Sequence, residues 1–106
     1  MSDIQTFSES EDGVYKMVGM LDLGTVAGWK ERGVDILEKA QEGVRFDLAN
    51  AEVKGSAAIV LLIALKREGE RMEKQVEFTN CSEELQSMAR VCGVQDILWH
   101  GDTHES

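Results

Sequence analysis

Hydrophobic and polar positions are patterned most clearly over residues 44–67. Apolar residues alternate with polar or small ones over 44–49, and this period of two predicts a strand with one buried face. After a polar bend, nine consecutive apolar residues, 57–65, end in Lys66-Arg67. Alanine, leucine and a basic pair at the end favour a helix. Because this helix is apolar all round, we expect it to be largely buried or to offer one side to a partner.

The bend between this strand and helix reads Lys54-Gly55-Ser56-Ala57-Ala58. Gly55 can adopt backbone conformations closed to other residues, and Ser56 can cap the helix. The hydroxyl of Ser56 has a second interpretation that is compatible with the first. At the positive end of a helix it can receive a phosphoryl group or contact a partner. We therefore expect function at this junction and no catalytic machinery anywhere in the chain.

The N-terminal part predicts an edge strand and then a core strand. Residues 1–12 are polar and acidic and form a flexible or edge-strand arm, in which Ile4 and Phe7 can hold a short strand. Gly13 ends this arm, and 14–21 is a β-rich run that predicts a strand.

Helical spacing begins after this strand. Thr25 is the expected cap, and apolar residues recur from Val26 at helical intervals until Gly43, which is predicted to end the helix. Trp29 is predicted to anchor this helix in the core. The apolar helix after the bend is predicted to end at Gly69.

The C-terminal part predicts one more strand and helix. Residues 75–80 alternate as a third core strand, and Ser82 caps a helix with acids in its first turn. Gly93 ends that helix, 94–99 form a last short apolar element, and 100–106 are an expected disordered tail. The apolar face of this helix is predicted to consist of Leu85, Met88, Ala89 and Val91.

Strands that alternate with helices predict an α/β layer fold. We expect a mixed, mainly parallel sheet of four to five strands, covered by three to four helices, in one domain over 13–99. The 106 residues and 11.8 kDa suit a single modest core.

Charge and composition limit the classes of partner that the chain can bind. The formal charge is −9 and the pI is about 4.6, so nucleic acid and anionic bilayer surfaces would be repelled. No segment approaches the roughly 20 apolar residues of a membrane span. Residues 1–3 have neither the basic nor the apolar region of a secretory signal, so we expect none. Cys81 and Cys92 lack the spacing of a zinc or redox pair. We expect a cytoplasmic protein.

Catalytic signatures are missing from the sequence. Neither nucleotide-binding glycine motif occurs, nor a nucleophile elbow, and the only histidines, His100 and His104, lie in the tail. A metal site of these histidines with Asp102 is a minor alternative to a solvated tail. A small-ligand site lacks a convergent polar cluster. We expect no enzyme activity, no cofactor and no metal.

Two stretches together resemble the STAS domain family, the fold of anti-sigma factor antagonists. Residues 19–26, GMLDLGTV, are similar to its G-x-L-D-x-x-T-v segment, on the motif residues Gly19, Asp22 and Thr25. The stretch 44–67 lies where the family carries a D-[ST]-[ST]-G-L loop between a strand and an apolar helix. The resemblance covers about 14–99.

Carried over by position, the family's phosphorylatable serine corresponds to Ser56, and the hydroxyl residue before it corresponds to Gly55. The family's acid corresponds to Lys54 and its glycine to Ala57. These departures weaken a kinase-recognition role more than a docking role, because a kinase recognises the shape and charge of that loop.

Within the family, the chain is most similar to the small cytoplasmic STAS subunit of the Mla phospholipid ABC transporter, which maintains outer-membrane lipid asymmetry. The resemblance rests on the length, the LLIALKREG run and the ARVCGVQDIL segment. It implies a non-enzymatic subunit that binds the ATPase subunit and is cytoplasmic or peripheral to the inner membrane through its partner. The expected contact residues are Lys54, Gly55, Ser56, Ala57, Ala58, Val60 and Leu61.

The alternative is an anti-sigma factor antagonist, which binds a serine kinase until Ser56 is phosphorylated. A homodimer through the apolar helix is a further option that the pattern allows.

Overall fold

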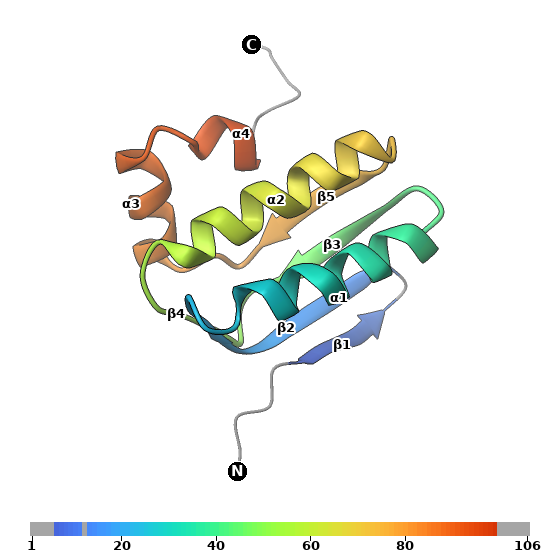
Figure 1. Cartoon of the computed structure of the whole chain (residues 1–106), viewed down its shortest axis with the longest axis horizontal. Coiled ribbons are helices and arrows are strands. Elements are labelled where there is room, and N and C mark those ends of the chain that lie inside the picture. Colours follow the sequence, from blue (N-terminus) through green and yellow to red (C-terminus); the bar gives the residue numbers. More distant parts are fainter. Residues whose placement is uncertain (1–5, 12, 100–106) are drawn as a thin grey trace.

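The computed structural model describes residues 6–11 and 13–99. Over these residues strands and helices follow one another largely as the sequence predicts (Figure 1). The strands are β1 (Thr6–Glu11), β2 (Val14–Leu21), β3 (Gly43–Asp47), β4 (Ala51–Val53) and β5 (Gln75–Thr79). The helices are α1 (Val26–Lys39), α2 (Ala57–Arg71), α3 (Glu83–Val91) and α4 (Gln95–Trp99).

The strands form a mixed sheet in the order β1-β2-β3-β5, and the short β4 pairs with the end of β2. β1 is antiparallel to β2, whereas the other pairs are parallel. The parallel register places Tyr15 beside Phe46, and Phe46 beside Phe78. The predicted α/β fold with a mixed, mainly parallel sheet and covering helices is confirmed over the described residues.

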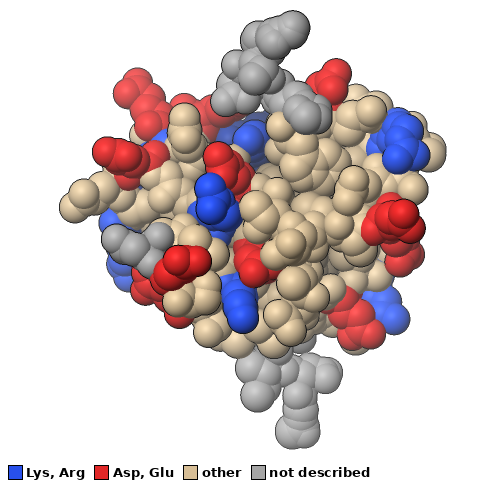
Figure 2. All heavy atoms as spheres, turned by 180° about the vertical axis from the view of Figure 1, so that it is seen from behind, with Lys and Arg blue, Asp and Glu red and all other residues tan. Residues whose placement is uncertain are grey.

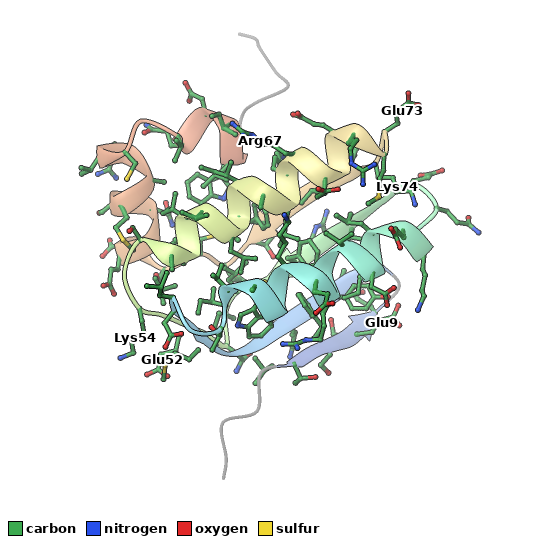
Figure 3. The ribbon with its side chains drawn as sticks, in the orientation of Figure 1. Glu9, Glu52, Lys54, Arg67, Glu73 and Lys74 are labelled. Carbon is green, nitrogen blue, oxygen red and sulfur yellow. The ribbon has the colours of Figure 1, made fainter. Side chains whose placement is uncertain are left out.

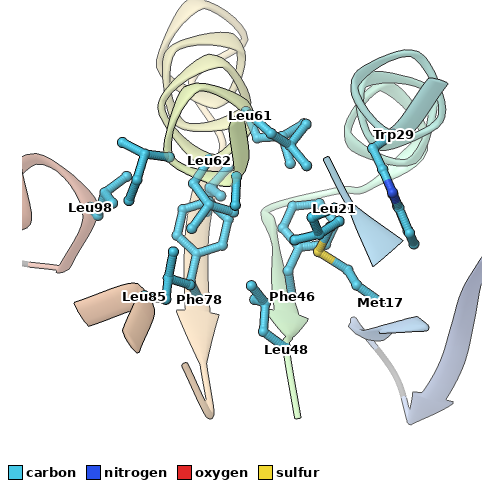
Figure 4. Close-up of a cluster of buried hydrophobic side chains, with 14 of the residues drawn as sticks. Met17, Leu21, Trp29, Phe46, Leu48, Leu61, Leu62, Phe78, Leu85 and Leu98 are labelled. Carbon is cyan, nitrogen blue, oxygen red and sulfur yellow. The ribbon is translucent and has the colours of Figure 1, made fainter. Parts of the chain in front are cut away.

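The core lies between the sheet and its helical layer. Helices α1 and α2 run side by side across one face of the sheet, while α3 and α4 pack beside α2 and β5 (Figure 1). Trp29 of α1 is fully buried, as predicted, and its indole Nε1 donates to the carbonyl oxygen of Met20 at 2.9 Å. Phe46, Leu62 and Phe78 fill the centre of the core (Figure 4).

The predicted edge strand near the N-terminus is confirmed as β1. Its Phe7 ring packs edge-on against Trp29, with ring centroids 5.1 Å apart, and contacts Phe46 at 5.5 Å. Ile4, the other residue expected to hold this strand, lies outside the described residues.

The opposite face of the sheet carries mixed charge. Figure 2 shows basic and acidic side chains interspersed on this face. One pair is Arg45 on β3 and Glu77 on β5, neighbours in register, whose Nε and Oε1 atoms lie 2.9 Å apart. Both side chains are about half exposed, so the pair stabilises the fold only weakly. This face is a polar surface and does not form a second core.

Two glycines predicted to end helices have other positions. Helix α1 ends at Lys39, and Gly43 is the first residue of β3. Gly69 lies inside α2, which continues to Arg71. A Cβ atom at Gly69 would meet the Val76 side chain, so this glycine permits α2 to approach β5. The prediction for Gly69 is wrong because a glycine inside a helix can allow close packing against a neighbouring element without ending the helix.

The structure differs from the sequence-based predictions at two further places, near the site and in α3. Strand β4 was not predicted, because three residues are too few to show a period. Val91 was expected on the apolar face of α3 but is 86% exposed, whereas Leu85 and Ala89 are buried. Val91 follows the buried Ala89 by two residues, which places it on the opposite side of the helix.

The tail 100–106, with His100, Asp102 and His104, lies outside the described residues. Among residues 6–11 and 13–99, no cluster of three or more metal-ligating side chains is found. In the same part of the chain, every helix is too short or too polar to cross a bilayer.

Candidate partner-binding surface

The junction singled out in the sequence is the turn between β4 and α2, at the carboxyl edge of the sheet. Lys54, Gly55 and Ser56 are all exposed there. Gly55 has a φ of +78°, and nothing lies within 4 Å of a Cβ atom built on it. A glycine is therefore favoured by the left-handed backbone and not by crowding.

Ser56 occupies the position before α2, but it does not cap the helix as predicted. Its φ and ψ are −76° and −5°, which is helical, and its side chain makes no capping hydrogen bond. A capping serine needs an extended backbone, as Ser82 has before α3 with φ −66° and ψ 159°. There the Ser82 hydroxyl accepts from the backbone N–H of Leu85 at 3.1 Å. The Ser56 hydroxyl is left exposed beside the uncapped N–H groups of α2.

Lys54 contacts an acid on the preceding strand. Its Nζ lies 3.7 Å from Oε2 of Glu52, and Figure 3 shows the two side chains next to each other. Both are more than half exposed, so the pair is weak and a partner can displace it at little cost.

Only part of the predicted contact set lies on the surface of α2. Val60 is 60% exposed and Ala57 is partly exposed. Ala58 and Leu61 were expected to contact a partner, and this is wrong: they are 0% and 1% exposed. They lie on the side of α2 that packs into the core, so a partner cannot reach them without opening the fold.

The family-motif residues have a structural role in the neighbouring turn between β2 and α1. Oδ1 of Asp22 accepts from the backbone N–H groups of Gly24 at 2.9 Å and Thr25 at 3.0 Å. Oγ1 of Thr25 accepts from the N–H of Asp22 at 3.0 Å and donates to the Met20 carbonyl at 2.8 Å. Thr25 was expected to cap α1, but it makes no side-chain cap and instead ties the turn to the end of β2.

Gly19, the third motif residue, has a φ of +133° within β2. Its N–H donates to the Asn50 carbonyl at 3.4 Å, beside the place where β4 begins. This backbone shape is open to glycine and strained for other residues, so Gly19 helps to join β4 to the sheet.

Leu23 is an exposed apolar residue that the sequence analysis missed. It is 84% exposed in the turn between β2 and α1. The N–H of Lys54 donates to the Leu21 carbonyl at 2.9 Å, so this turn lies beside the turn that carries Ser56. A leucine between Asp22 and Gly24, outside any helical or strand period, was the available signal. Leu23 therefore adds apolar surface in a turn next to the one that carries Ser56.

The ionisable groups described offer no reactive arrangement at this surface. Burial raises the pKa of the Cys81 thiol, which keeps it protonated and unreactive. Hydrogen bonds from the Asn80 side chain and the Ala49 backbone lower the pKa of Asp47, which holds the turn after β3. The surface presents a hydroxyl, a loose ion pair and apolar side chains, which suit docking of another protein.

The chain matches a model of a known protein family. The STAS domain model matches residues 4–106, nearly the whole chain. The chain belongs to the STAS domain family. Membership in the STAS family indicates a protein-interaction role of the kind that anti-sigma factor antagonists have. A search of curated proteins found no match.

Proposed function

We propose that this STAS protein is a non-enzymatic, cytoplasmic subunit that binds the ATPase subunit of a lipid-transport ABC transporter and supports its activity. It would correspond to the MlaB-type subunits, which its LLIALKREG and ARVCGVQDIL segments resemble. Peripheral association with the inner membrane would then come through the partner.

The observation that carries the proposal is the exposure of Val60 in the first turn of α2, next to the open turn at Ser56. Val60 and Leu23 offer apolar surface, whose burial contributes about 25 cal/mol per Å² before the costs of association. The Ser56 hydroxyl and the uncapped N–H groups beside it can pair with polar groups of the partner.

Co-expression with the ABC-transporter ATPase subunits of the same organism tests the proposal. The wild-type chain should co-purify with one of them. Val60→Glu should weaken this complex by about tenfold or more, because a carboxylate would be desolvated in the contact. The matched control is Val91→Glu, the same change at an exposed valine on α3, which should leave the complex intact. Failure of the wild-type chain to retain any ATPase subunit would remove the assignment.

The second candidate is an anti-sigma factor antagonist switched by phosphorylation of Ser56. The exposed Ser56 hydroxyl favours it, because a kinase can reach this group and the end of α2 would stabilise a phosphate. Lys54 and Ala57 stand where the family has an acid and a glycine, so we rank it second. Incubation with a cognate serine kinase and ATP tests it by mass. A gain of about 80 Da that Ser56→Ala abolishes would favour the switch.

A further inference from the structure

A shallow groove runs along the outer face of α2 beside α1 and begins at Val60, one helical turn after Ser56. Its volume is about 430 Å³. Apolar side chains form its floor, and charged side chains stand around it. The lining residues are Lys30 of α1 and Val60, Ile63, Ala64, Arg67 and Glu68 of α2.

The spacing of the floor fits a helical ligand. Val60, Ile63 and Ala64 follow one another at the three- and four-residue intervals that form a ridge on a helix. Helices α1 and α2 lie side by side (Figure 1), and at Gly33 a Cβ atom would come within 2.6 Å of the Leu65 side chain. Two helices this close leave a furrow along their outer surface, into which a third helix can pack.

The charge around the groove is positive in an otherwise acidic chain. The sequence has 20 acidic and 11 basic residues, and the structure describes all 11 basic ones. Glu68 is already engaged, because its Oε1 lies 2.7 Å from Nη2 of Arg71. Lys30 and Arg67 have no ion pair within 4.0 Å among the described residues. The groove therefore offers two cations that make no ion pair with a described residue, next to an apolar floor.

We propose that this groove receives an amphipathic helix of the partner protein, with acidic residues facing Lys30 and Arg67. The inference rests on the proposed function, because it takes the outer face of α2 as the docking side. The apolar face of the helix packs on Val60, Ile63 and Ala64. The lined stretch 60–68 is about 12 Å long at 1.5 Å per residue, so roughly two to three turns of the partner helix are in contact.

Two synthetic peptides test the charge preference. Both are fluorescein-labelled helices of about 14 residues, stapled to hold the helix, with Leu and Ala on one face. The acidic peptide has Glu on both flanks of that face, and the basic peptide has Lys at the same positions. Binding is measured by fluorescence polarisation at physiological salt, where charges beyond about 8 Å are largely screened. The wild-type chain should bind the acidic peptide about tenfold tighter, against the bias of its net charge.

A matched pair of double variants localises the effect. Lys30→Glu with Arg67→Glu should reverse the preference, whereas Lys16→Glu with Arg90→Glu should keep it. Lys16 and Arg90 also lack an ion pair among the described residues and lie outside the groove. Each change lowers the formal charge by two, so both double variants carry −13 instead of −9. Circular dichroism checks that both remain folded.

Four outcomes would overturn the inference: equal or tighter binding of the basic peptide, binding of neither peptide, an unchanged preference in the groove variant, or an equal loss in the control. Each leaves the proposed function to its own test, because co-purification of an ATPase subunit is measured separately. A wild-type chain that binds the acidic peptide but retains no ATPase subunit would keep the groove and remove the transporter assignment.

Discussion

Two turns at the same edge of the sheet carry the residues by which this chain resembles its family, and they differ in how the fold uses them. In the turn between β2 and α1, Asp22 and Thr25 make hydrogen bonds that close the turn. In the turn between β4 and α2, Ser56 makes no capping bond and Gly55 touches nothing at its missing side chain. A hydroxyl that the fold uses is not available to a partner, whereas an unused one is.

The difference follows from the neighbours of each hydroxyl, because the backbone conformation before the two helices is similar. The residue before each helix, Thr25 or Ser56, has a helical ψ, so neither side chain can cap its own helix. Thr25 finds other partners, because the end of β2 brings the Met20 carbonyl within 2.8 Å. Ser56 follows a strand of only three residues, and no carbonyl of residues 6–11 or 13–99 accepts a hydrogen bond from its hydroxyl. Similar motif positions therefore have different roles.

The largest effect on stability is expected at the closed turn. Thr25→Val removes the acceptor of the Asp22 N–H and a donor to the Met20 carbonyl, both partly buried. The Met20 carbonyl keeps the bond from Trp29 Nε1, whereas the Asp22 N–H loses its side-chain acceptor, and leaving such a group unpaired costs about 1–3 kcal/mol. Urea unfolding of the variant and the wild type measures the difference. A change below about 0.5 kcal/mol would show that the turn is not held by these bonds.

A smaller loss is expected at Gly55 in the open turn. Gly55→Ala places a Cβ atom in a left-handed conformation, which costs roughly 1–2 kcal/mol, but the Cβ atom meets no neighbour. Gly55→Asn should cost less, because asparagine tolerates this conformation. The same unfolding measurement compares the two. If both variants lost the same amount of stability, and more than this, a side chain at position 55 would be meeting a steric contact. That result would contradict the open turn.

A smaller difference in the free energy of unfolding is expected between the two serines predicted as caps, Ser56 and Ser82. Ser82→Ala should lower the free energy of unfolding by about 1 kcal/mol, because it removes the bond to the Leu85 N–H. Ser56→Ala should change it by less than about 0.5 kcal/mol, because no bond is lost. The pair is matched in chemistry and in position before a helix. A loss at Ser56 equal to that at Ser82 would contradict the open turn.

The smallest effect concerns a third turn at this edge, which Asp47 closes. Hydrogen bonds from Asn80 and Ala49 lower the pKa of Asp47 in the folded state. The stabilisation is therefore present above the ordinary pKa of Asp47 and is lost as the pH falls through the lowered value. Asn80→Ala should raise the pKa of Asp47 toward its ordinary value, as an NMR titration of the carboxyl group measures. An unchanged pKa would assign the shift to Ala49 alone.

The sequence was informative wherever one period dominated. Strands β3 and β5 follow from alternation, β2 from a β-rich run and the burial of Trp29 from helical spacing, and Ser82 is a cap as predicted. The ends of the helices and their buried faces were harder to predict. Gly69 breaks the expected pattern because its role is contact with β5, a neighbour that only the tertiary fold supplies.

At the candidate site, the sequence located the turn but not its exposed side chains. The uniform apolar run 57–65 has no polar stripe, so it could not show that Ala58 and Leu61 face inward and Val60 outward. Leu23 was missed because a turn has no hydrophobic period. The turn of Leu23 lies next to Lys54 because β4 pairs with β2, and β4 was not predicted.

The most direct test of the central claim, that the start of α2 docks a partner protein, is hydrogen–deuterium exchange of this chain alone and in complex with the co-purified ATPase subunit. The account predicts slower exchange of the backbone amides of 54–60 in the complex, with those of α3 unchanged. Slower exchange confined to α3 or to the open face of the sheet, with 54–60 unaffected, would contradict it.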